Sequence, residues 1–473
     1  MCRPSSAALP NPGLFPWGSM VAMSLALLAN GIALTSLFAY VGFMVTDLGI
    51  SPDTNAAGFT AGYISGAFMI GRLFSSFFWG SFSDHVGRKP VLYLSLAAIV
   101  IFSVLFGCST TFAMALSSRL LIGFFNAIVG TCRTAISEIC GPYYEVRGMG
   151  FLMGSWSVSF VIGPAIGGLL ARPAVQYPGA FGTGGLFGRF PYLLPNLVAA
   201  AVAAVALPCV YFVMPETSGS TESSEPPSPP PPPHKTDGAW AARGERRSAG
   251  TVGDSAADGG NRNGGGRSRI RVRKSAAPPP GDGSPAPDEP SLSGCAALPH
   301  LLGGAGGRLR RALLGTYGLF SFLSIIYDEV LPLWCITSVT AGGLGWGTGQ
   351  MLSISGLFLV CFQFAMFPPL ARRLGVVRFM KAALALLVPL YLLFPLAGRL
   401  AGRSVSLDAT VVALSIAAKS MSNVVFASHA LCTNNAVETE ARGSFNGLMM
   451  TAGSAAKGTA PAVGSIIYAW SVT

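Results

Sequence analysis

The sequence predicts an all-α membrane protein built from two helical bundles that a polar linker joins. Its 473 residues are 51% hydrophobic and only 11% charged, with a mean hydropathy of +0.54. Soluble globular proteins are roughly 25% charged. Apolar runs of about 20 residues, the length that a helix needs to cross a bilayer, recur along the chain. This composition excludes an ordinary cytosolic enzyme.

The apolar runs predict the membrane-spanning helices. Six runs form a first bundle over 20–214, which follows a cytosolic tail over 1–19. Further runs form a second bundle over 308–473. The expected spans are 20–46, 57–79, 90–107, 112–133, 149–171, 191–214, 311–336, 348–370, 377–398, 407–432 and 444–470.

The composition of the segment 215–307 between the bundles predicts that it is a disordered cytosolic linker. It contains the proline run Pro229 to Pro233 and the Gly- and Arg-rich stretch Asn261 to Lys274. Such a composition cannot bury enough apolar surface to offset the entropy of ordering. A cytosolic N-terminus places twelve Lys and Arg residues near the spans on the cytosolic side and four on the other. This positive-inside bias explains the net charge of +11, so no nucleic-acid partner is expected.

Short motifs repeat between the two halves. Glu145, Arg147 and Gly148 precede span five, and Glu440, Arg442 and Gly443 precede the last span. Pro164-Ala165-x-Gly167 matches Pro461-Ala462-x-Gly464 in the same way. A duplication predicts two pseudo-symmetric bundles, an arrangement typical of secondary transporters with a substrate site near the bilayer midplane.

The loop between spans two and three carries a dense group of Gly and charged residues. Gly80 permits close helix approach, Gly87 permits a tight reversal, and Asp84 accepts hydrogen bonds from Arg88 or from a helix N-terminus. Together with Lys89 and Glu138, these residues predict a cytosolic gate. The alternative is a short basic loop that only sets topology, and the spacing alone does not separate the two. We expect Arg72 in span two to pair within the gate.

The loop resembles the signature Gly-x3-Asp-x2-Gly-Arg-Lys of the major facilitator superfamily. Arg119-x3-Gly123, Gly163-Pro164 with Gly167-Gly168, and Pro215-Glu216-Thr217 agree with further elements of that superfamily in order. The chain is also similar to the zinc-induced facilitator-like branch. That likeness rests on Phe78-Trp79-Gly80, Leu186 to Phe190, Tyr327-Asp328-Glu329, Leu333-Trp334, Asn434-Asn435 and Arg442-Gly443.

The resemblance implies two six-helix bundles, alternating access and a cavity lined by spans one, four, seven and ten. With no apolar run after 444–470, we expect the last helix to be missing. The branch implies roles in zinc, chelator or ion homeostasis at the vacuolar or plasma membrane, a choice that stays open. The Gly163-Pro164 element favours antiport, and its glycines predict a helix bend and close packing against the other half.

Helical phase places polar residues on one face of three of these spans. The stripes are Arg119, Gly123, Asn126, Gly130 and Arg133 in span four; Tyr317, Ser321, Ser324 and Asp328 in span seven; and Ser415, Lys419, Ser422, His429 and Thr433 in span ten. Three stripes on helices expected to face the cavity favour a hydrophilic pathway.

Charged residues within spans are costly and therefore usually face protein or water. The resemblance assigns the position of Arg119 to proton coupling, and a helix brace is the alternative. Asp328 continues its stripe and is the expected proton or cation carrier, whereas Glu329, about 100° away, is expected to brace a neighbouring helix. Lys419 and Lys457 are candidates for binding an anionic group or for counter-charges, with snorkelling as the alternative. His429 is a candidate titrating group or a structural residue.

These observations predict a proton-coupled antiporter of a small hydrophilic solute, such as a metal chelator, an organic ion or a metal-linked solute. Charges of both signs in the stripes favour a zwitterionic or chelating solute. The alternatives are a drug:proton efflux antiporter and a non-transporting sensor or scaffold. The sequence contains no cluster of catalytic residue types that would predict an enzyme. We expect no cofactor and no protein-bound metal. The expected partners are the solute, protons and the lipid bilayer, and the chain is expected to be a monomer.

Overall fold

The computed structural model describes residues 14–49, 54–182, 184–217, 298–304, 306–336, 356–398 and 405–472. Within these ranges the regular structure is helical throughout, which confirms the predicted all-α class. Nine of the described helical segments are long and apolar enough to cross a membrane. The chain is therefore an integral membrane protein.

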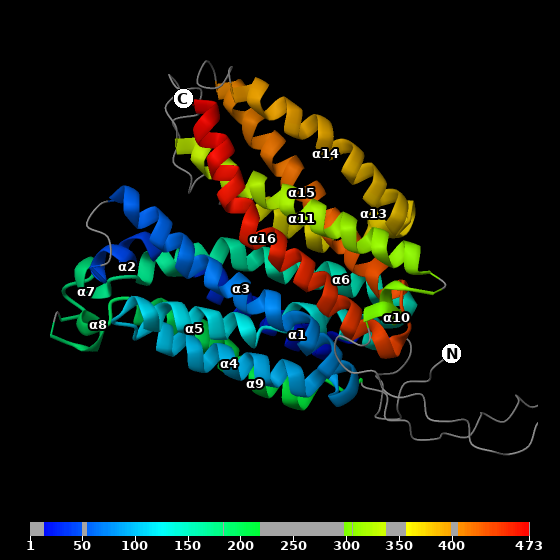
Figure 1. Cartoon of the computed structure of the whole chain (residues 1–473), viewed down its shortest axis with the longest axis horizontal. Helices are drawn as coiled ribbons and strands as arrows, with labels where there is room; N and C mark the ends of the chain where they lie inside the picture. Colours follow the sequence, from blue (N-terminus) through cyan, green and yellow to red (C-terminus); the bar gives the residue numbers. More distant parts are fainter. Residues whose placement is uncertain are drawn as a thin grey trace, which may run out of the picture. The chain divides into compact units, whose positions relative to one another are not determined.

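The first half contains helices that match the six predicted spans, and Figure 1 shows them in blue to green. The elements are α1 (Trp17–Thr35), η1 (Ser36–Ala39), α2 (Val41–Asp47), α3 (Thr54–Val86), α4 (Arg88–Gly107), α5 (Phe112–Phe124), α6 (Ile128–Leu170), α7 (Pro173–Gln176), α8 (Leu186–Arg189) and α9 (Leu193–Val213). The first span is interrupted at η1, and the fourth is interrupted between α5 and α6. The backbone of α6 leaves the helical region at Gly141, whose φ of 58° lies in the left-handed range. This glycine separates spans four and five.

The second half carries five long helical regions, shown in yellow-green to red in Figure 1. The elements are α10 (Leu298–Leu302), α11 (Gly307–Ile336), the π-helix η4 (Phe362–Met366), α13 (Phe367–Leu374), α14 (Val376–Gly398), α15 (Val405–Asn435), η5 (Thr439–Ala441) and α16 (Arg442–Val472). The missing twelfth helix stays a prediction.

Both ends of the predicted linker 215–307 are ordered, contrary to expectation. At its start, Glu216 accepts hydrogen bonds from the backbone amides of Arg88 and Lys89. At its end, α10 packs on α11, where Arg311 donates to the Leu302 carbonyl at 2.6 Å. Polar linker residues gain order here because helix ends present unpaired backbone groups to them. The predicted disorder of 218–297 lies outside the described residues.

Two seams of small residues join the halves. Helices α3 and α16 cross at Gly80, Gly443 and Gly447, where a Cβ on Gly80 would lie 2.3 Å from the Gly443 carbonyl oxygen. The second seam joins α6 to η4, where a Cβ on Gly154 would lie 2.5 Å from the Phe364 ring. Glycines at such spacings let helix backbones approach closely inside a membrane.

Candidate functional site

The end of the molecule that is predicted to face the cytosol is held by Asp84, at the end of α3. Its carboxylate accepts hydrogen bonds from the backbone amides of Gly443 at 2.8 Å and Ser444 at 2.6 Å, and from the Ser444 hydroxyl at 2.6 Å. These amides belong to the first turn of α16, where the helix dipole favours a negative charge. Asp84 therefore caps a helix of the other half.

Arg88, the first residue of α4, connects Asp84 of α3 to Glu138 of α6. Its guanidinium forms ion pairs of 2.8 Å with Asp84 and with Glu138 of α6, and all three side chains are at most 6% exposed. Burial raises the pKa of Asp84 above its ordinary value, and the Arg88 charge and the bonds from Ser444 and Gly443 only partly oppose this. We call Asp84, Arg88, Glu138 and Ser444 the cytosolic lock. The geometry favours the gate prediction over a merely topogenic loop.

Gly87 and Lys89 serve the lock indirectly. Gly87 has φ 114°, and a Cβ there would lie 2.7 Å from the Glu216 carboxyl carbon. A side chain at this position would displace Glu216 from the amides of Arg88 and Lys89. The Lys89 ammonium lies 5.1 Å from the centre of the Tyr211 ring, within the same half. Its charge is directed away from the lock, whereas its backbone amide holds the loop.

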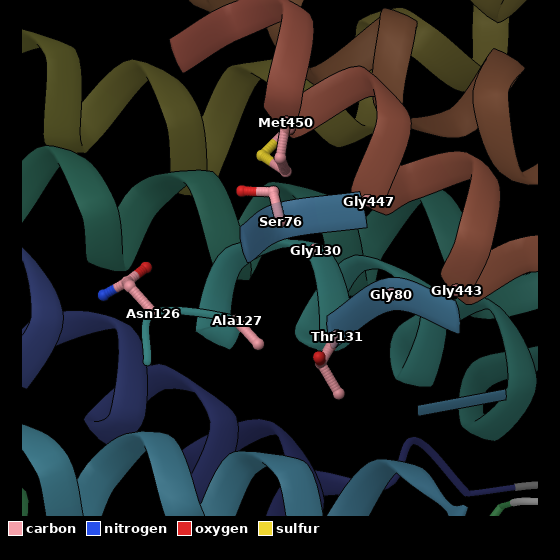
Figure 2. A pocket seen from close by; sticks show the side chains of 9 residues that line it. All are labelled: Ser76, Gly80, Asn126, Ala127, Gly130, Thr131, Gly443, Gly447 and Met450. Carbon is pink, nitrogen blue, oxygen red and sulfur yellow. The ribbon is translucent and has the colours of Figure 1, made fainter. Parts of the chain in front are cut away.

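Behind the lock, the halves leave almost no space. Figure 2 shows Met450 of α16 above Ser76 of α3, and Gly443 and Gly447 beside Gly80. The gap that these residues line has a volume of about 10 Å³, the lower bound for one water molecule. Asn126, which also lines it, donates a 2.5 Å hydrogen bond to Asn30 of α1. The halves are therefore in close contact along α3 and α16, whereas a second pocket of about 330 Å³ lies beside Glu145 and Asn435, between α6, α14 and α15.

Buried asparagines reinforce this end, and the sequence analysis did not assign them to the site. Asn434 of α15 donates to the Arg133 carbonyl at 2.8 Å, and Asn446 of α16 donates to Asn434 at 2.8 Å and to Thr134 at 3.1 Å. The bonds to Arg133 and Thr134 cross between the halves. The signal available in the sequence was an amide side chain within an apolar helix, where an unpaired polar group is costly.

Arg119 is enclosed within the first half. It is 1% exposed, donates to the Ala33 carbonyl at 2.8 Å, and lies over the rings of Phe68 and Phe106 at 5.5 and 5.4 Å. Among the described residues it forms no ion pair, and its Nε and Nη2 atoms have no hydrogen-bond partner. The structure does not bring Arg119 together with Asp328.

Asp328 of α11 pairs instead with Lys419 of α15, at 3.2 Å. The Asp328 side chain is 39% exposed and that of Lys419 21%, so the pair is not enclosed by the described protein. The remaining polar residues of both stripes are buried, including Ser321, Ser324 and Ser415. The side chain of Glu329 lies outside the described residues.

The remaining charged candidates gather where the halves meet. Arg133 of α6 donates to the Tyr317 hydroxyl of α11 at 3.4 Å, and its guanidinium lies 5.8 Å from the centre of that ring. Arg72 donates to the Met450 sulfur at 2.9 Å instead of joining the lock, which corrects the expected gate pairing. Twelve residues of helix, about 18 Å, separate it from Asp84. Lys457 and His429 lie beside Tyr317, whose ring centre is 5.8 Å from that of His429.

The glycines of span five pack within the first half, not against the other half as expected. A Cβ on Gly163 would lie 1.9 Å from the Thr35 hydroxyl, and one on Gly167 would lie 2.1 Å from the Ser36 carbonyl oxygen. Helical backbone angles continue through Pro164, and the break in α6 is at Gly141. The closest atom to a Cβ on Gly168 is the Ala39 Cβ at 4.0 Å, an ordinary contact. Gly150 and Gly154 of the same helix face the other half.

Within the part of the chain that the structure describes, no group of three or more His, Cys, Asp or Glu side chains is placed to hold a metal ion.

Comparisons with known proteins agree with this geometry. The family model described as Major Facilitator Superfamily matches residues 23–461. A probable peptide/nitrate transporter of Arabidopsis thaliana is 31% identical over 446 residues, which cover 94% of this chain and 81% of that protein. Protein Zinc Induced Facilitator 1 of the same plant is 30% identical over 469 residues, with coverages of 97% and 85%. The crystal structure of the human organic anion transporter MFSD10 aligns with a TM-score of 0.65 at 18% identity, covering 97% of this chain and 95% of that one.

Proposed function

Since this chain belongs to the major facilitator superfamily, we propose that it is a secondary active transporter that exchanges a small hydrophilic solute for protons. The observation that carries this proposal is the cytosolic lock. Asp84 of the first half holds the first turn of α16 through a few short, directional bonds, and Arg88 pairs with Asp84. Contacts of this kind are either made or broken, so they suit a rocking motion between two discrete states.

The Asp328–Lys419 pair supplies the proposed coupling element. A proton that binds Asp328 removes its charge and weakens the 3.2 Å pair, which frees α11 and α15 to separate. Arg119 serves as a fixed positive charge in the first half, because an arginine guanidinium does not lose its proton in proteins. Asp328 is therefore the proposed carrier of the coupled proton, and Arg119 neither binds nor releases that proton.

Uptake into proteoliposomes with an imposed pH gradient tests this proposal. Candidate solutes are a nicotianamine-like chelator, zinc and potassium, measured with and without the gradient. We expect uptake that follows the gradient in the native chain and loses that dependence in Asp328→Asn. The matched control is Glu438→Gln, which changes an exposed carboxylate without a described side-chain partner and is expected to leave uptake unchanged. Uptake that is the same with and without the gradient, and the same in Asp328→Asn as in the native chain, would reject proton coupling.

A drug:proton efflux antiporter is the second candidate from the same fold. The buried polar stripes favour the hydrophilic solute because an apolar drug would leave their hydroxyl and charged groups unpaired. Gradient-dependent flux of a lipophilic cation that exceeds the flux of every hydrophilic probe would favour the drug antiporter. Binding of a hydrophilic probe without any flux would favour a sensor.

A further inference from the structure

Three buried or partly buried cations act electrostatically on Tyr317 at the interface between the halves, and one of them, Arg133, also contacts it. Arg72 comes from α3, Arg133 from α6 and Lys457 from α16, and we call them the cationic cluster. Arg72 and Arg133 are each 5% exposed, and Tyr317 is 3% exposed. The charges of all three act on the Tyr317 phenol, and they repel one another. The cluster therefore concentrates positive charge in a small volume shared by both halves.

No ion pair among the described residues neutralises this charge, and the Asp328 carboxylate acts on Lys457 only electrostatically. The ion pairs among the described residues involve Arg88, Arg172 and Lys419, and none includes a member of the cluster. Arg72 donates to a methionine sulfur, a weak acceptor, and Arg133 to a neutral phenol. The Nε atoms of both arginines are buried without a hydrogen-bond partner. Buried cations in a membrane protein require an anionic or polar partner to offset their desolvation.

The position of the cluster suits a bound solute. Met450, which accepts the bond from Arg72, also lines the narrow gap in Figure 2. Lys457 follows the locked end of α16 by 14 residues from Gly443, about 21 Å of helix, which places it well inside the bilayer. The cluster therefore lies beyond the cytosolic lock, between elements that must move apart during alternating access. His429 adds a buried Nδ1 atom that also has no partner.

We propose that the transported solute is an organic anion, whose carboxylate or phosphate oxygens are bound by Arg72, Arg133 and Lys457 between the two halves. This inference rests on the proposed transport function and names its substrate class. Arginine guanidinium groups bind such oxygens in paired hydrogen bonds, and the free Nε atoms supply the donors. The Asp328–Lys419 pair is neutral as a whole and leaves the positive excess to the cluster.

Fluorescence anisotropy of two dyes with a shared three-ring skeleton tests the charge preference. Fluorescein is an anion and rhodamine 123 is a cation, and each is titrated with the purified full chain in a neutral detergent. We expect fluorescein to bind at least about tenfold more tightly, a difference of about 1.4 kcal/mol. Citrate should displace fluorescein, whereas spermidine should not. Equal or tighter binding of rhodamine 123 would overturn the proposal.

Charge-removing variants locate the site. Arg133→Gln and Arg72→Gln are each expected to raise the fluorescein Kd about tenfold, whereas Arg133→Lys, which keeps the charge but not the paired donors, should raise it by less. Arg378→Gln, which changes an exposed arginine of α14, is the matched control and should bind as the native chain does. Thermal unfolding of each variant in the same detergent separates lost binding from lost folding. A fluorescein Kd that is the same in Arg133→Gln, Arg72→Gln and the control would overturn the assignment.

Two further arms separate the sources of an anionic group and the two proposals. Displacement of fluorescein by phosphatidylglycerol but not by citrate would show a lipid-headgroup site and reject a soluble solute. The binding assay uses no pH gradient, so it does not depend on proton coupling. Gradient-driven flux of cations without anion binding would reject only the anionic class, and anion binding without gradient-dependent flux would reject only the proposed function.

Discussion

The Asp84 carboxylate accepts two hydrogen bonds of 2.6 Å from Ser444, one from its backbone amide and one from its hydroxyl. Asp84 ends a helix of the first half, and Ser444 lies in the first turn of a helix of the second half. A capping interaction that normally lies within one chain segment thus connects the two moving bodies. Removing it leaves helix-terminal amides unpaired in the closed state, so its loss should shift the molecule toward cytosolic opening.

Asp84→Ala is expected to open the predicted cytosolic end. The reporter is Ser76→Cys in a chain without its other cysteines, because Ser76 lines the narrow gap. We expect an impermeant maleimide, applied from the cytosolic side, to label this thiol at least about tenfold faster in Asp84→Ala, since charged hydrogen bonds contribute about 1.5–3 kcal/mol each. Glu438→Gln is the control. Equal labelling rates in the three chains would show that Asp84 does not hold the gate.

Acidification should strengthen the lock. Burial raises the pKa of Asp84 above 3.8, so the closed state binds a proton more readily than a solvated carboxyl does. Protonation of Asp84 therefore adds stability to the closed state at low pH, beyond that of its hydrogen bonds, and this added stability is lost as the pH rises through the raised pKa. Arg88 is the charged group that faces it, and Glu138 lies on the far side of Arg88.

The same thiol reporter measures this pH dependence. Labelling of Ser76→Cys at pH 5 and pH 7.5 is normalised to labelling of the unfolded chain at each pH. We expect slower normalised labelling at pH 5, and no such difference in Asp84→Ala. Faster labelling at pH 5 would show that the ionised carboxylate, and not the protonated one, favours closure.

Gly80→Val is expected to prevent close approach of α3 and α16. The new Cβ would lie 2.3 Å from the Gly443 carbonyl oxygen, and overpacking of this kind costs about 1–3 kcal/mol. Gly66→Ala is the matched control in the same helix, because a Cβ there meets no atom within 4 Å. We expect a lower unfolding temperature in detergent for Gly80→Val alone. Equal unfolding temperatures for both variants would mean that the seam has room for a side chain.

Arg172→Ala is expected to destabilise the first half at its other end. Arg172 donates to Asp47 at 2.8 Å and to Tyr192 at 3.2 Å, and the Asp47 bonds raise the pKa of Arg172. Because both charged side chains are about one third exposed, the loss should be only about 1 kcal/mol. Arg172 also has φ 51°, so Arg172→Gly should recover part of that loss by relieving backbone strain.

Thermal unfolding of the two Arg172 variants in detergent measures both effects. Asp47→Asn, which removes the ion pair without changing the backbone at position 172, is the control for the charge. A glycine variant that is less stable than the alanine variant would contradict the strain argument.

The helices could be predicted from the sequence because the bilayer imposes their length and composition. Runs such as 90–107 and 191–214 agree with α4 and α9 within a few residues. The interruption at Phe125 to Ala127 could not be predicted, since Asn126 is its only turn-favouring residue and also fits the polar face of a continuous helix. The ordered ends of the linker were missed for a different reason, because Glu216 gains order only from amides that the fold brings near it.

The site was predictable where one loop contains its residues and unpredictable where the halves meet. Asp84 and Arg88 lie four residues apart on the two sides of the turn at Gly87, so a short stretch of sequence contains both partners of the pair. The contact between Arg133 and Tyr317 joins residues 184 positions apart, and no local pattern specifies it. For the same reason, Gly163 and Gly167 were assigned to the wrong partner. Their spacing predicts a smooth helix face but not the helix that it meets.

The glycine seams determine how the two bodies can part. At Gly80 and Gly447 the surfaces in contact are peptide backbones, which have no rotamers to rearrange. Two helix surfaces of this kind can separate and come together again without a change of side-chain rotamer at the contact. If the halves rock as proposed, the few polar bonds at the rim govern the motion, and a change in those bonds is expected to alter the cycling rate.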